Sequence, residues 1–198
     1  MKKQALTPLL LSQTQLWIET ATITEPNDPT AAYLSTIGTD GFPDGRVVLV
    51  RIIDEHGFVF FTNHNSKKGQ DLLSTPRASL CFHWKTQRKQ IRVQGTISIA
   101  TQQESDDYYN GRARESRIGA WASEQSQILS SRDELIARYH HFETEFKDNE
   151  TPPRPPHWGG FRLTPHRIEF WQDGDHRLHD RDVYLFENDK WNKVKLYP

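Results

Sequence analysis

The amino-acid sequence predicts an α+β fold that is mainly β, in which an antiparallel β-barrel carries helices on its outside. From Ala31 onward, short apolar runs are separated by turn residues, which is the pattern of successive antiparallel strands. Two capping patterns, Thr101–Glu104 and Ser131–Glu134, predict helix starts among these strands. A length of 198 residues suits one core, so we expect a single domain over residues 26–198, preceded by an arm or short helix over residues 1–25.

Composition argues against several classes of protein. The 25 Lys and Arg residues are balanced by 26 Asp and Glu residues, so a general basic surface for nucleic acid is not expected. Cys81 is the single cysteine, which rules out an intrachain disulfide or a thiolate zinc cluster; we expect no metal and a cytoplasmic location. The apolar run near the N-terminus is broken by Pro8, and no run approaches the ~20 residues that cross a bilayer. We therefore expect neither export nor membrane insertion.

The first half of the domain is predicted to be a β-meander followed by a helix and two more strands. Meander strands are expected over residues 31–37, 46–53 and 58–62, with turns at residues 40–45 and 54–57. Ser66 is suited to cap a helix that ends before Pro76. The two further strands are expected over residues 78–84 and 90–100.

The second half is predicted to hold two helices, a connector and a hairpin. The helix that begins near Ser131 carries an apolar stripe that we expect to pack in the core, formed by Leu135, Tyr139, Phe142 and Phe146. The prolines within residues 151–156 require an extended connector, because they can neither continue a helix nor donate to a sheet. Strands over residues 167–172 and 177–186 would then flank a turn at residues 173–175.

This last hairpin is polar where strands are ordinarily apolar. If residues 177–186 form a strand, Arg177, His179 and Arg181 share one face, because successive side chains point to opposite faces. Trp171 lies just across the turn. An indole beside two guanidiniums and an imidazole suits a flat, anionic, aromatic ligand. A solvated edge strand has the same composition, so the residues alone leave both interpretations open.

Other polar positions are candidates for an anion site. Ser66, Lys67 and Lys68 stand at a helix start, where free amides and ammonium groups favour a phosphate. Arg46 and Arg51, five residues apart on one strand, point to opposite faces, and ordinary strand-end charge explains them equally well. A solvated strand face would also explain Gln90, and a surface helix end would also explain Tyr108, Arg112 and Ser116. Gln125 and Ser126 could hydrogen-bond to a heterocycle.

Taken together, these segments resemble the pyridoxamine 5'-phosphate oxidase family. The residues that carry the resemblance are Asp28–Ala31, Arg46–Val50, Gly57–Asn63, Ser66–Lys68, Thr75–Arg77, Arg88–Gln90, Ser116–Ser126, His157–Phe161 and, most specifically, Glu169–Arg181. The resemblance implies an FMN-binding split β-barrel with peripheral helices that forms a homodimer, with two flavin sites at the subunit interface.

The resemblance also implies an activity and a set of site residues. The expected reaction converts pyridoxamine or pyridoxine 5'-phosphate to pyridoxal 5'-phosphate, with hydride transfer from C4' to the flavin and reoxidation by O2 to H2O2. The implied FMN contacts are Arg46, Val47, Val48, Leu49, Val50, Arg51, Phe61, Thr62, Lys67, Lys68, Gln90, Gln125, Ser126, Trp171 and Arg181. The implied substrate contacts are Arg51, Tyr108, Arg112, Ser116, Arg177, Leu178 and His179, with Arg177 and His179 as the catalytic pair.

Three positions depart from the usual pattern of the family. Arg51 stands where lysine is usual, Lys67 where arginine is usual, and Phe61 where tyrosine is usual. The N-terminal residues also lack the Arg and Tyr pattern that folds over bound substrate in the family. Two alternatives therefore stay open: a related flavin oxidase with another substrate, of the phenazine-biosynthesis type, or a non-catalytic protein that binds FMN or pyridoxal phosphate.

Overall fold

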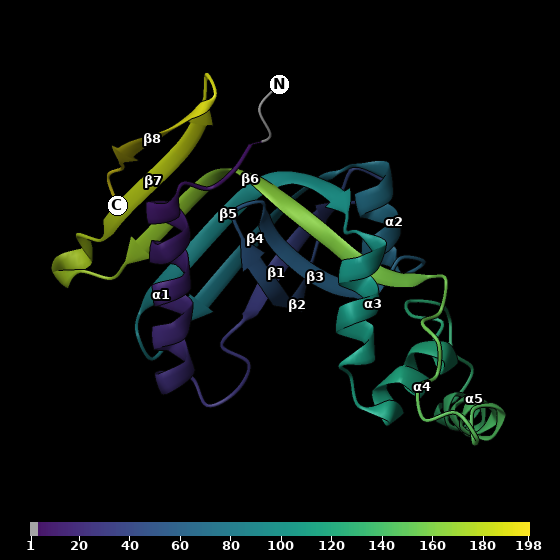
Figure 1. The fold of residues 1–198 in the computed structure, drawn as a ribbon. Coiled ribbons are helices and arrows are strands. Elements are labelled where there is room, and N and C mark those ends of the chain that lie inside the picture. Colours follow the sequence, from purple (N-terminus) through teal and green to yellow (C-terminus); the bar gives the residue numbers. More distant parts are fainter. Residues whose placement is uncertain (1–3) are drawn as a thin grey trace.

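The structure, a computed structural model, describes residues 4–198. Within that range eight strands form one antiparallel sheet in the order β3-β2-β1-β4-β5-β6-β7-β8, and β3 also pairs with β6. This pairing closes β1–β6 into a barrel, and β7 and β8 extend the sheet beyond it (Figure 1). The strands are β1 Ala31–Ile37, β2 Pro43–Asp54, β3 Gly57–Asn63, β4 Arg77–Trp84, β5 Lys89–Ile99, β6 Trp158–Gln172, β7 Asp180–Glu187 and β8 Lys190–Lys195.

Helices surround the barrel on two sides. In Figure 1, α1 lies beside β7, whereas α3, α4 and α5 gather on the opposite side. Among the described residues the α-helices are α1 Pro8–Thr24, α2 Lys67–Ser74, α3 Gln102–Asn110, α4 Arg114–Ala122 and α5 Arg132–Glu145. No helix in residues 4–198 is long and apolar enough to span a membrane. The expected α+β barrel with outer helices is confirmed.

The barrel is filled by the inward side chains of its strands. Along β5, Ile91 and Val93 are fully buried while Arg92 and Gln94 are exposed, as the alternation in the sequence predicts. Further buried residues come from the other strands, among them Leu34, Val50, Phe58, Phe60, Leu80, Phe82, Phe161 and Leu163. The strand bounds differ from the predicted ones by at most three residues in the meander and by one in β4 and β5.

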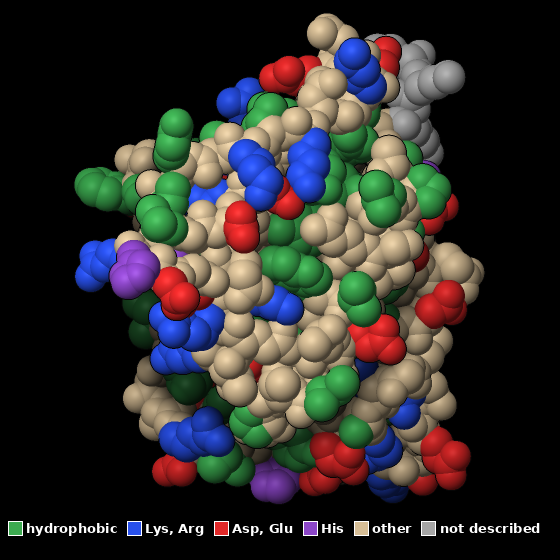
Figure 2. Space-filling view, turned by 90° about the vertical axis from the view of Figure 1, so that its left-hand side faces the viewer, with side chains coloured by type: hydrophobic (Ala, Val, Ile, Leu, Met, Phe, Trp, Pro, Cys, Tyr) green, Lys and Arg blue, Asp and Glu red, His purple; other side chains and the backbone are tan. Residues whose placement is uncertain are grey.

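Residues 8–24 form a full helix that is packed against the sheet. Thr7 caps α1, Pro8 occupies its first turn, and Leu10 and Ile18 are buried in the core. Trp191 of β8 donates a hydrogen bond from Nε1 to the Ala5 carbonyl at 2.8 Å, which fixes the segment before the helix. The face that carries α1, β7 and β8 is seen in Figure 2, where hydrophobic side chains lie among intermixed cations and carboxylates.

The predicted second strand of the last hairpin is wrong in its first residues. Residues 175–177 form a 3₁₀ turn, and β7 begins only at Asp180. His176 and Arg177 have φ values of 55° and 64°, a left-handed conformation that no strand contains. Arg177, His179 and Arg181 therefore do not share a strand face, and only Arg181 belongs to β7.

The predicted core stripe of α5 is also wrong. The helix buries none of its residues fully, and Leu135, Tyr139, Phe142 and Phe146 are half-buried. Phe142 and Phe146 pack on Trp121 of α4, with ring centroids 5.7 and 5.5 Å away. The stripe thus joins one outer helix to another. Of the two capping patterns, the one at Thr101 is complete. At α5 the Ser131 hydroxyl accepts from the Glu134 amide, but the Glu134 carboxylate accepts from the Ser130 amide and not from the Ser131 amide.

Candidate functional site

A cavity of about 660 Å³ lies between the barrel and the helices α3 and α4. Strand β2 contributes Val47, Leu49 and Arg51, which alternate along one face of the strand. A β-bulge interrupts the strand at Arg51, where the register with β3 shifts between Val50 and Ile52. The other lining residues are Val48, Phe61, Thr62, Asn63, Lys68, Tyr108, Arg112, Ala113, Ser116, Gly119, Ala120, Ser123, Gln125 and Trp158.

The residues that line the cavity include three cations, Arg51, Lys68 and Arg112, and no carboxylate. Among the residues that the structure describes, the Lys68 ammonium contacts neutral oxygens alone, those of Gln125 at 3.0 Å, Ser66 at 3.3 Å and Thr62 at 3.4 Å. Burial, with the charge of Arg46, lowers the pKa of Lys68. An acid-free lining with uncompensated positive charge favours an anionic ligand.

Arg112 is positioned by aromatic rings. Its guanidinium lies 4.9 Å from the centre of the Trp158 ring and 5.9 Å from that of Tyr109. Nη1 is buried and has no hydrogen-bond partner within the described residues. Burial lowers the pKa of Arg112. A buried guanidinium nitrogen without an acceptor is costly, so this atom marks a place where a ligand oxygen would be favourable.

One wall of the cavity is a stack of aromatic rings. Phe61 lies 4.3 Å from Tyr108 and 5.8 Å from Trp158 between ring centroids, with interplanar angles of 12° and 8°. Arg51 lies over the outer face of this wall, 5.9 Å from the centre of the Tyr108 ring. Parallel rings beside cations provide a flat apolar surface bordered by positive charge.

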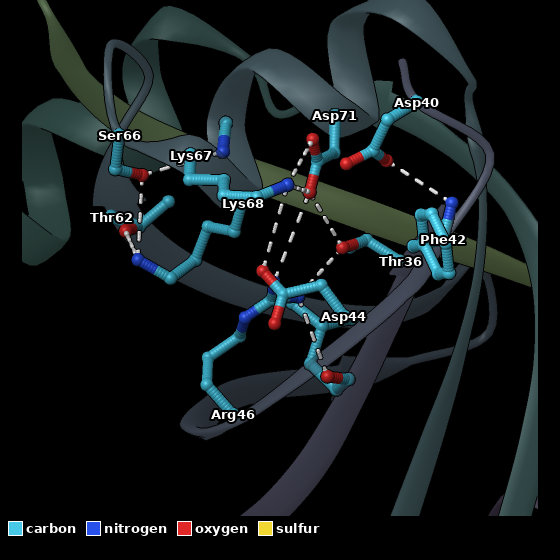
Figure 3. A network of polar contacts seen from close by, with 12 residues as sticks. Thr36, Asp40, Phe42, Asp44, Arg46, Thr62, Ser66, Lys67, Lys68 and Asp71 are labelled. Carbon is cyan, nitrogen blue, oxygen red and sulfur yellow. Dashed lines mark hydrogen bonds and ion pairs between the residues drawn. The ribbon is translucent and has the colours of Figure 1, made fainter. Parts of the chain in front are cut away.

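Next to the Lys68 corner of the cavity lies an ion cluster of four residues, Asp44, Arg46, Lys67 and Asp71 (Figure 3). Arg46 donates from Nη2 to Asp44 at 2.5 Å and from Nη1 to Thr36 at 2.8 Å. The Lys67 ammonium is 3.2 Å from Asp71 and 3.8 Å from Asp44. Arg46 and Lys67 thus face carboxylates, although both were expected at an anion site, and neither lines the cavity.

A second group of expected residues lies at the 3₁₀ turn and the strand ends beside it. Trp171 pairs with Gln90 of β5 and Arg181 of β7, and its ring is 4.7 Å from that of His179. Nδ1 of His179 is 3.0 Å from the Asp173 carboxylate, which orients the imidazole. Arg177 and Leu178 are exposed at the tip, Leu178 to 71%.

Arg181 is held in place by a buried carboxylate. Glu169 of β6 is fully buried and lies 2.7 Å from Arg181, 2.6 Å from Arg167 and 3.5 Å from Arg92. Burial alone would raise the pKa of Glu169, but the hydrogen bonds from Arg181 and Arg167 and the nearby charges outweigh it, so that the pKa is lowered.

The two groups of residues are far apart in one chain. None of the residues at the turn lines the cavity. Trp158 in the cavity and Trp171 at the turn stand at opposite ends of β6, thirteen positions apart, or about 40 Å of extended strand at ~3.3 Å per residue. Figure 1 shows the turn on the side opposite α3 and α4. Four expected contacts belong to neither group. Arg46 and Lys67 lie in the ion cluster, Val50 is buried in the core, and Ser126 lines a separate cleft after α4.

Several lining residues were not identified individually from the sequence. Trp158 is the most important, because it stacks on Phe61 and supports Arg112. Trp158 lies in the His157–Phe161 segment that carries part of the family resemblance. A single tryptophan, however, shows no periodicity that would separate a cavity residue from a core residue. Asn63, Ala113, Gly119, Ala120 and Ser123 also line the cavity, and small residues of this kind carry no chemical signal in a sequence.

Comparison with known proteins places the chain in a family. The family described as "Pyridoxamine 5'-phosphate oxidase" matches residues 19–172, and "Pyridoxine 5'-phosphate oxidase C-terminal dimerisation region" matches residues 158–198. The chain belongs to the pyridoxamine 5'-phosphate oxidase family. The pyridoxine/pyridoxamine 5'-phosphate oxidases of Brucella canis and Brucella abortus (strain 2308) are both 47% identical to it over 184 residues, which cover 92% of this chain and 90% and 88% of theirs. As a member of this family, the chain is an oxidoreductase.

Solved structures of the family show the same fold. PhzG from Burkholderia lata 383, crystallised in complex with tetrahydrophenazine-1-carboxylic acid, is 31% identical with a TM-score of 0.88, covering 95% of this chain and 92% of that one. A pyridoxamine 5'-phosphate oxidase-related, FMN-binding protein from Nostoc punctiforme has a TM-score of 0.76 at 15% identity, with 98% and 99% coverage. The family's dimerisation region contains β6, the 3₁₀ turn, β7 and β8, so the turn lies within the segment whose family match supports a homodimer.

Proposed function

We propose that the chain is an FMN-dependent oxidase that converts pyridoxamine 5'-phosphate or pyridoxine 5'-phosphate to pyridoxal 5'-phosphate, with O2 as the acceptor and H2O2 as the second product. The reaction would belong to vitamin B6 metabolism in the cytoplasm. The observation that carries the proposal is the cavity, which combines three cations, no carboxylate and a wall of stacked rings. A phosphate-bearing cofactor and a phosphate-bearing aromatic substrate fit such a lining.

The lining supports FMN as the cofactor. The polar side-chain atoms of Lys68, Thr62 and Gln125 lie within 3.4 Å of one another. Together they would hold the phosphate end of the flavin. Val47 and Leu49 would lie along the flavin as apolar neighbours. Bound FMN would supply the acceptor for the hydride that leaves C4' of the substrate.

The substrate's phosphate would bind at the other end of the cavity. Within residues 4–198, Nη1 of Arg112 is buried and has no hydrogen-bond partner, and Arg51, Tyr108 and Ser116 line the same cavity. Two guanidiniums and two hydroxyls provide the planar, charge-assisted hydrogen bonds that a phosphate dianion prefers. Arg51, in place of a lysine, keeps the charge and presents a planar fork of N–H donors instead of a point charge.

The turn would complete the site from a second protomer. A bound pyridine phosphate spans far less than the length of β6, so the Arg177 and His179 of the same chain cannot reach a ligand held by Arg112. We therefore propose a homodimer with two composite sites, in which the turn of one protomer covers the cavity of the other. His179, oriented by Asp173 and Trp171, would hydrogen-bond to the amine or hydroxyl on C4', and Arg177 would place positive charge against the charge that develops during transfer.

A second candidate function is supported by the PhzG comparison. That protein is 31% identical over nearly the whole chain and binds a tricyclic carboxylic acid, not a phosphate ester. The two candidates differ in the anion that Arg51 and Arg112 would meet, because a carboxylate accepts one bidentate pair whereas a phosphate accepts more hydrogen bonds.

The test is the visible spectrum of the FMN-reconstituted protein, mixed anaerobically with pyridoxamine 5'-phosphate. We expect the oxidised flavin bands to bleach and to return in air as pyridoxal 5'-phosphate forms. Bound flavin that does not bleach with this substrate, but does with a reduced phenazine carboxylic acid, would favour the second candidate.

A variant tests the proposed phosphate contact. In Arg112→Ala we expect kcat/KM for pyridoxamine 5'-phosphate to fall about 10- to 100-fold, because a buried charge-assisted hydrogen bond is lost. Turnover of pyridoxamine, which lacks the phosphate, should change little. Arg132→Ala, an exposed arginine at the start of α5, is the matched control. An equal loss with both substrates would show that Arg112 does not bind the phosphate.

A further inference from the structure

The two carboxylates of the ion cluster differ in how they are held (Figure 3). Asp71 has a side chain that is 5% exposed, and it accepts hydrogen bonds from Thr36 at 2.9 Å and from Lys67 at 3.2 and 3.3 Å. Asp44 has a side chain that is 39% exposed, and its contacts are with Arg46 at 2.5 Å and Lys67 at 3.8 Å. Asp71 is therefore fixed from several sides, whereas Asp44 is free to turn toward solvent.

Asp44 occupies the part of Arg46 that remains available to an anion. Nη1 of Arg46 donates to the Thr36 hydroxyl at 2.8 Å and lies 3.5 Å from the Leu34 carbonyl. Nη2 is therefore the end that faces acidic groups, Asp44 at 2.5 Å and Asp71 at 3.9 Å. The same Asp44 oxygen, Oδ2, is the atom that lies between this guanidinium and the Lys67 ammonium. An oxygen shared between a guanidinium and an ammonium is also how a bound phosphate oxygen is held.

The cluster is electrically coupled to the cavity. Lys68 follows Lys67 at the start of α2, and both Arg46 and Asp44 influence its pKa, Arg46 lowering it and Asp44 raising it after the larger effect of burial. The next residue after Arg46 is Val47, which lines the cavity. A phosphate at Lys68 would therefore lie beside Arg46 and would be repelled by the Asp44 carboxylate.

We propose that Asp44 is an internal competitor for the FMN phosphate. Its carboxylate takes the place of a phosphate oxygen on Arg46 and Lys67, and FMN binds with its full set of cations only after Asp44 turns away. Asp71 stays in place and keeps both cations next to the cavity. This inference rests on the proposed function, because it takes FMN as the ligand. Asp44 is thus a positioning residue that sets how tightly the cofactor is retained.

The experiment compares FMN with riboflavin, which lacks the phosphate. Binding to apoprotein is measured by the change in flavin fluorescence for the wild type and for Asp44→Asn. We expect the Kd for FMN to fall about tenfold in the variant, because a like charge beside the phosphate is removed, while the Kd for riboflavin stays unchanged. A purely structural effect would move both constants together.

Asp40→Asn is the matched control. Asp40 lies in the turn just before β2, and its Oδ1 accepts a hydrogen bond from the Phe42 amide at 3.1 Å instead of one from Arg46. The control removes the same charge, and we expect no change in the ratio of the two Kd values. Asp44→Ser removes the carboxylate in a second way and should reproduce the result of Asp44→Asn.

The outcomes separate this inference from the proposed function. If the wild type binds FMN and the Asp44 variants bind it equally or more weakly, the competitor role is overturned and the oxidase proposal stands. If Asp40→Asn tightens FMN as much as Asp44→Asn does, general charge and not competition at Arg46 is responsible. If the wild type binds no FMN at all, both proposals fail together.

Discussion

Glu169 shows how one residue determines the properties of a surface. Its carboxylate is fully buried, yet Arg92, Arg167 and Arg181 all approach it from the more exposed side. A buried carboxylate paired in this way neutralises part of a dense positive cluster and fixes the direction of each guanidinium. Glu169 therefore orients Arg181, for which the family resemblance implies a flavin contact.

We expect Glu169→Gln to lower the free energy of unfolding at neutral pH by about 3 kcal/mol, because a buried charge partner is removed. The pKa of Glu169 is lowered in the folded protein, so its contribution is fully present above its unfolded pKa of about 4.3 and is lost as pH falls through the folded value. Urea denaturation of wild type and variant at a series of pH values should show the difference shrinking below pH ~4. Glu187→Gln, an exposed residue at the end of β7, is the control. A difference that persists unchanged at low pH would contradict the assignment.

At the residue scale, the sequence indicated which cations line the cavity, but it did not indicate which cations are paired with carboxylates beside it. Arg51 and Lys68 were expected at an anion site and line the cavity, because alternation in a strand and position at a helix start are local properties. The pairing of Arg46 and Lys67 with Asp44 and Asp71 joins β2 to α2, and such contacts follow from tertiary packing that no local pattern contains.

At the element scale, helix caps link local sequence to the position of the site. The Thr101 hydroxyl accepts a hydrogen bond from the Glu104 amide, and the Glu104 carboxylate accepts one from the Thr101 amide. Helix α3 buries Tyr109 completely and carries Tyr108 to the cavity wall. By contrast, Ser131 caps α5, which buries none of its residues fully.

We expect Thr101→Ala to lower the free energy of unfolding by about 1 kcal/mol, in the range of 0.5–2 kcal/mol for a lost N-cap. Ser131→Ala removes the equivalent hydrogen bond from α5, where unfolding is expected to be local because no core contact depends on it. Its effect on the global transition should be smaller. Chemical denaturation monitored by tryptophan fluorescence and by circular dichroism measures both. Equal losses would show that α5 is coupled to the core as strongly as α3 is.

Element boundaries were predictable where one physical signal dominated. The strands of the barrel follow from alternation, and the start of α2 follows from Ser66, whose hydroxyl accepts the Gly69 amide. The hairpin failed at Arg177 and His179 because a polar strand face and a polar turn have the same composition, and the left-handed φ of Arg177 leaves no mark in sequence. The prediction for the α5 stripe failed because an amphipathic pattern indicates that one face of a helix is covered, but it does not indicate whether the core or another outer helix covers it.

At the scale of the whole molecule, the barrel separates the two halves of the proposed site. β6 carries Trp158 to the cavity at one end and Trp171 to the turn at the other. A monomer with this geometry presents a cation-rich cavity without Arg177 and His179, and a turn without a ligand to contact. Dimerisation would therefore be a condition of catalysis, and each protomer would contribute half of every site.

Mixed dimers test this division. Arg112→Ala damages the cavity and His179→Ala damages the turn, so homodimers of either variant should have low activity with pyridoxamine 5'-phosphate. When equal amounts are unfolded and refolded together, half of the dimers should be mixed, and each mixed dimer contains one site with both wild-type residues. We expect about one quarter of wild-type activity to return, with random pairing of equal protomers. Recovery cannot occur if Arg112 and His179 of the same chain serve the same site, because every site in every dimer would then lack one of them. Mixing either variant with itself controls for the refolding, and a mixture no more active than these controls would place both halves of the site within one protomer.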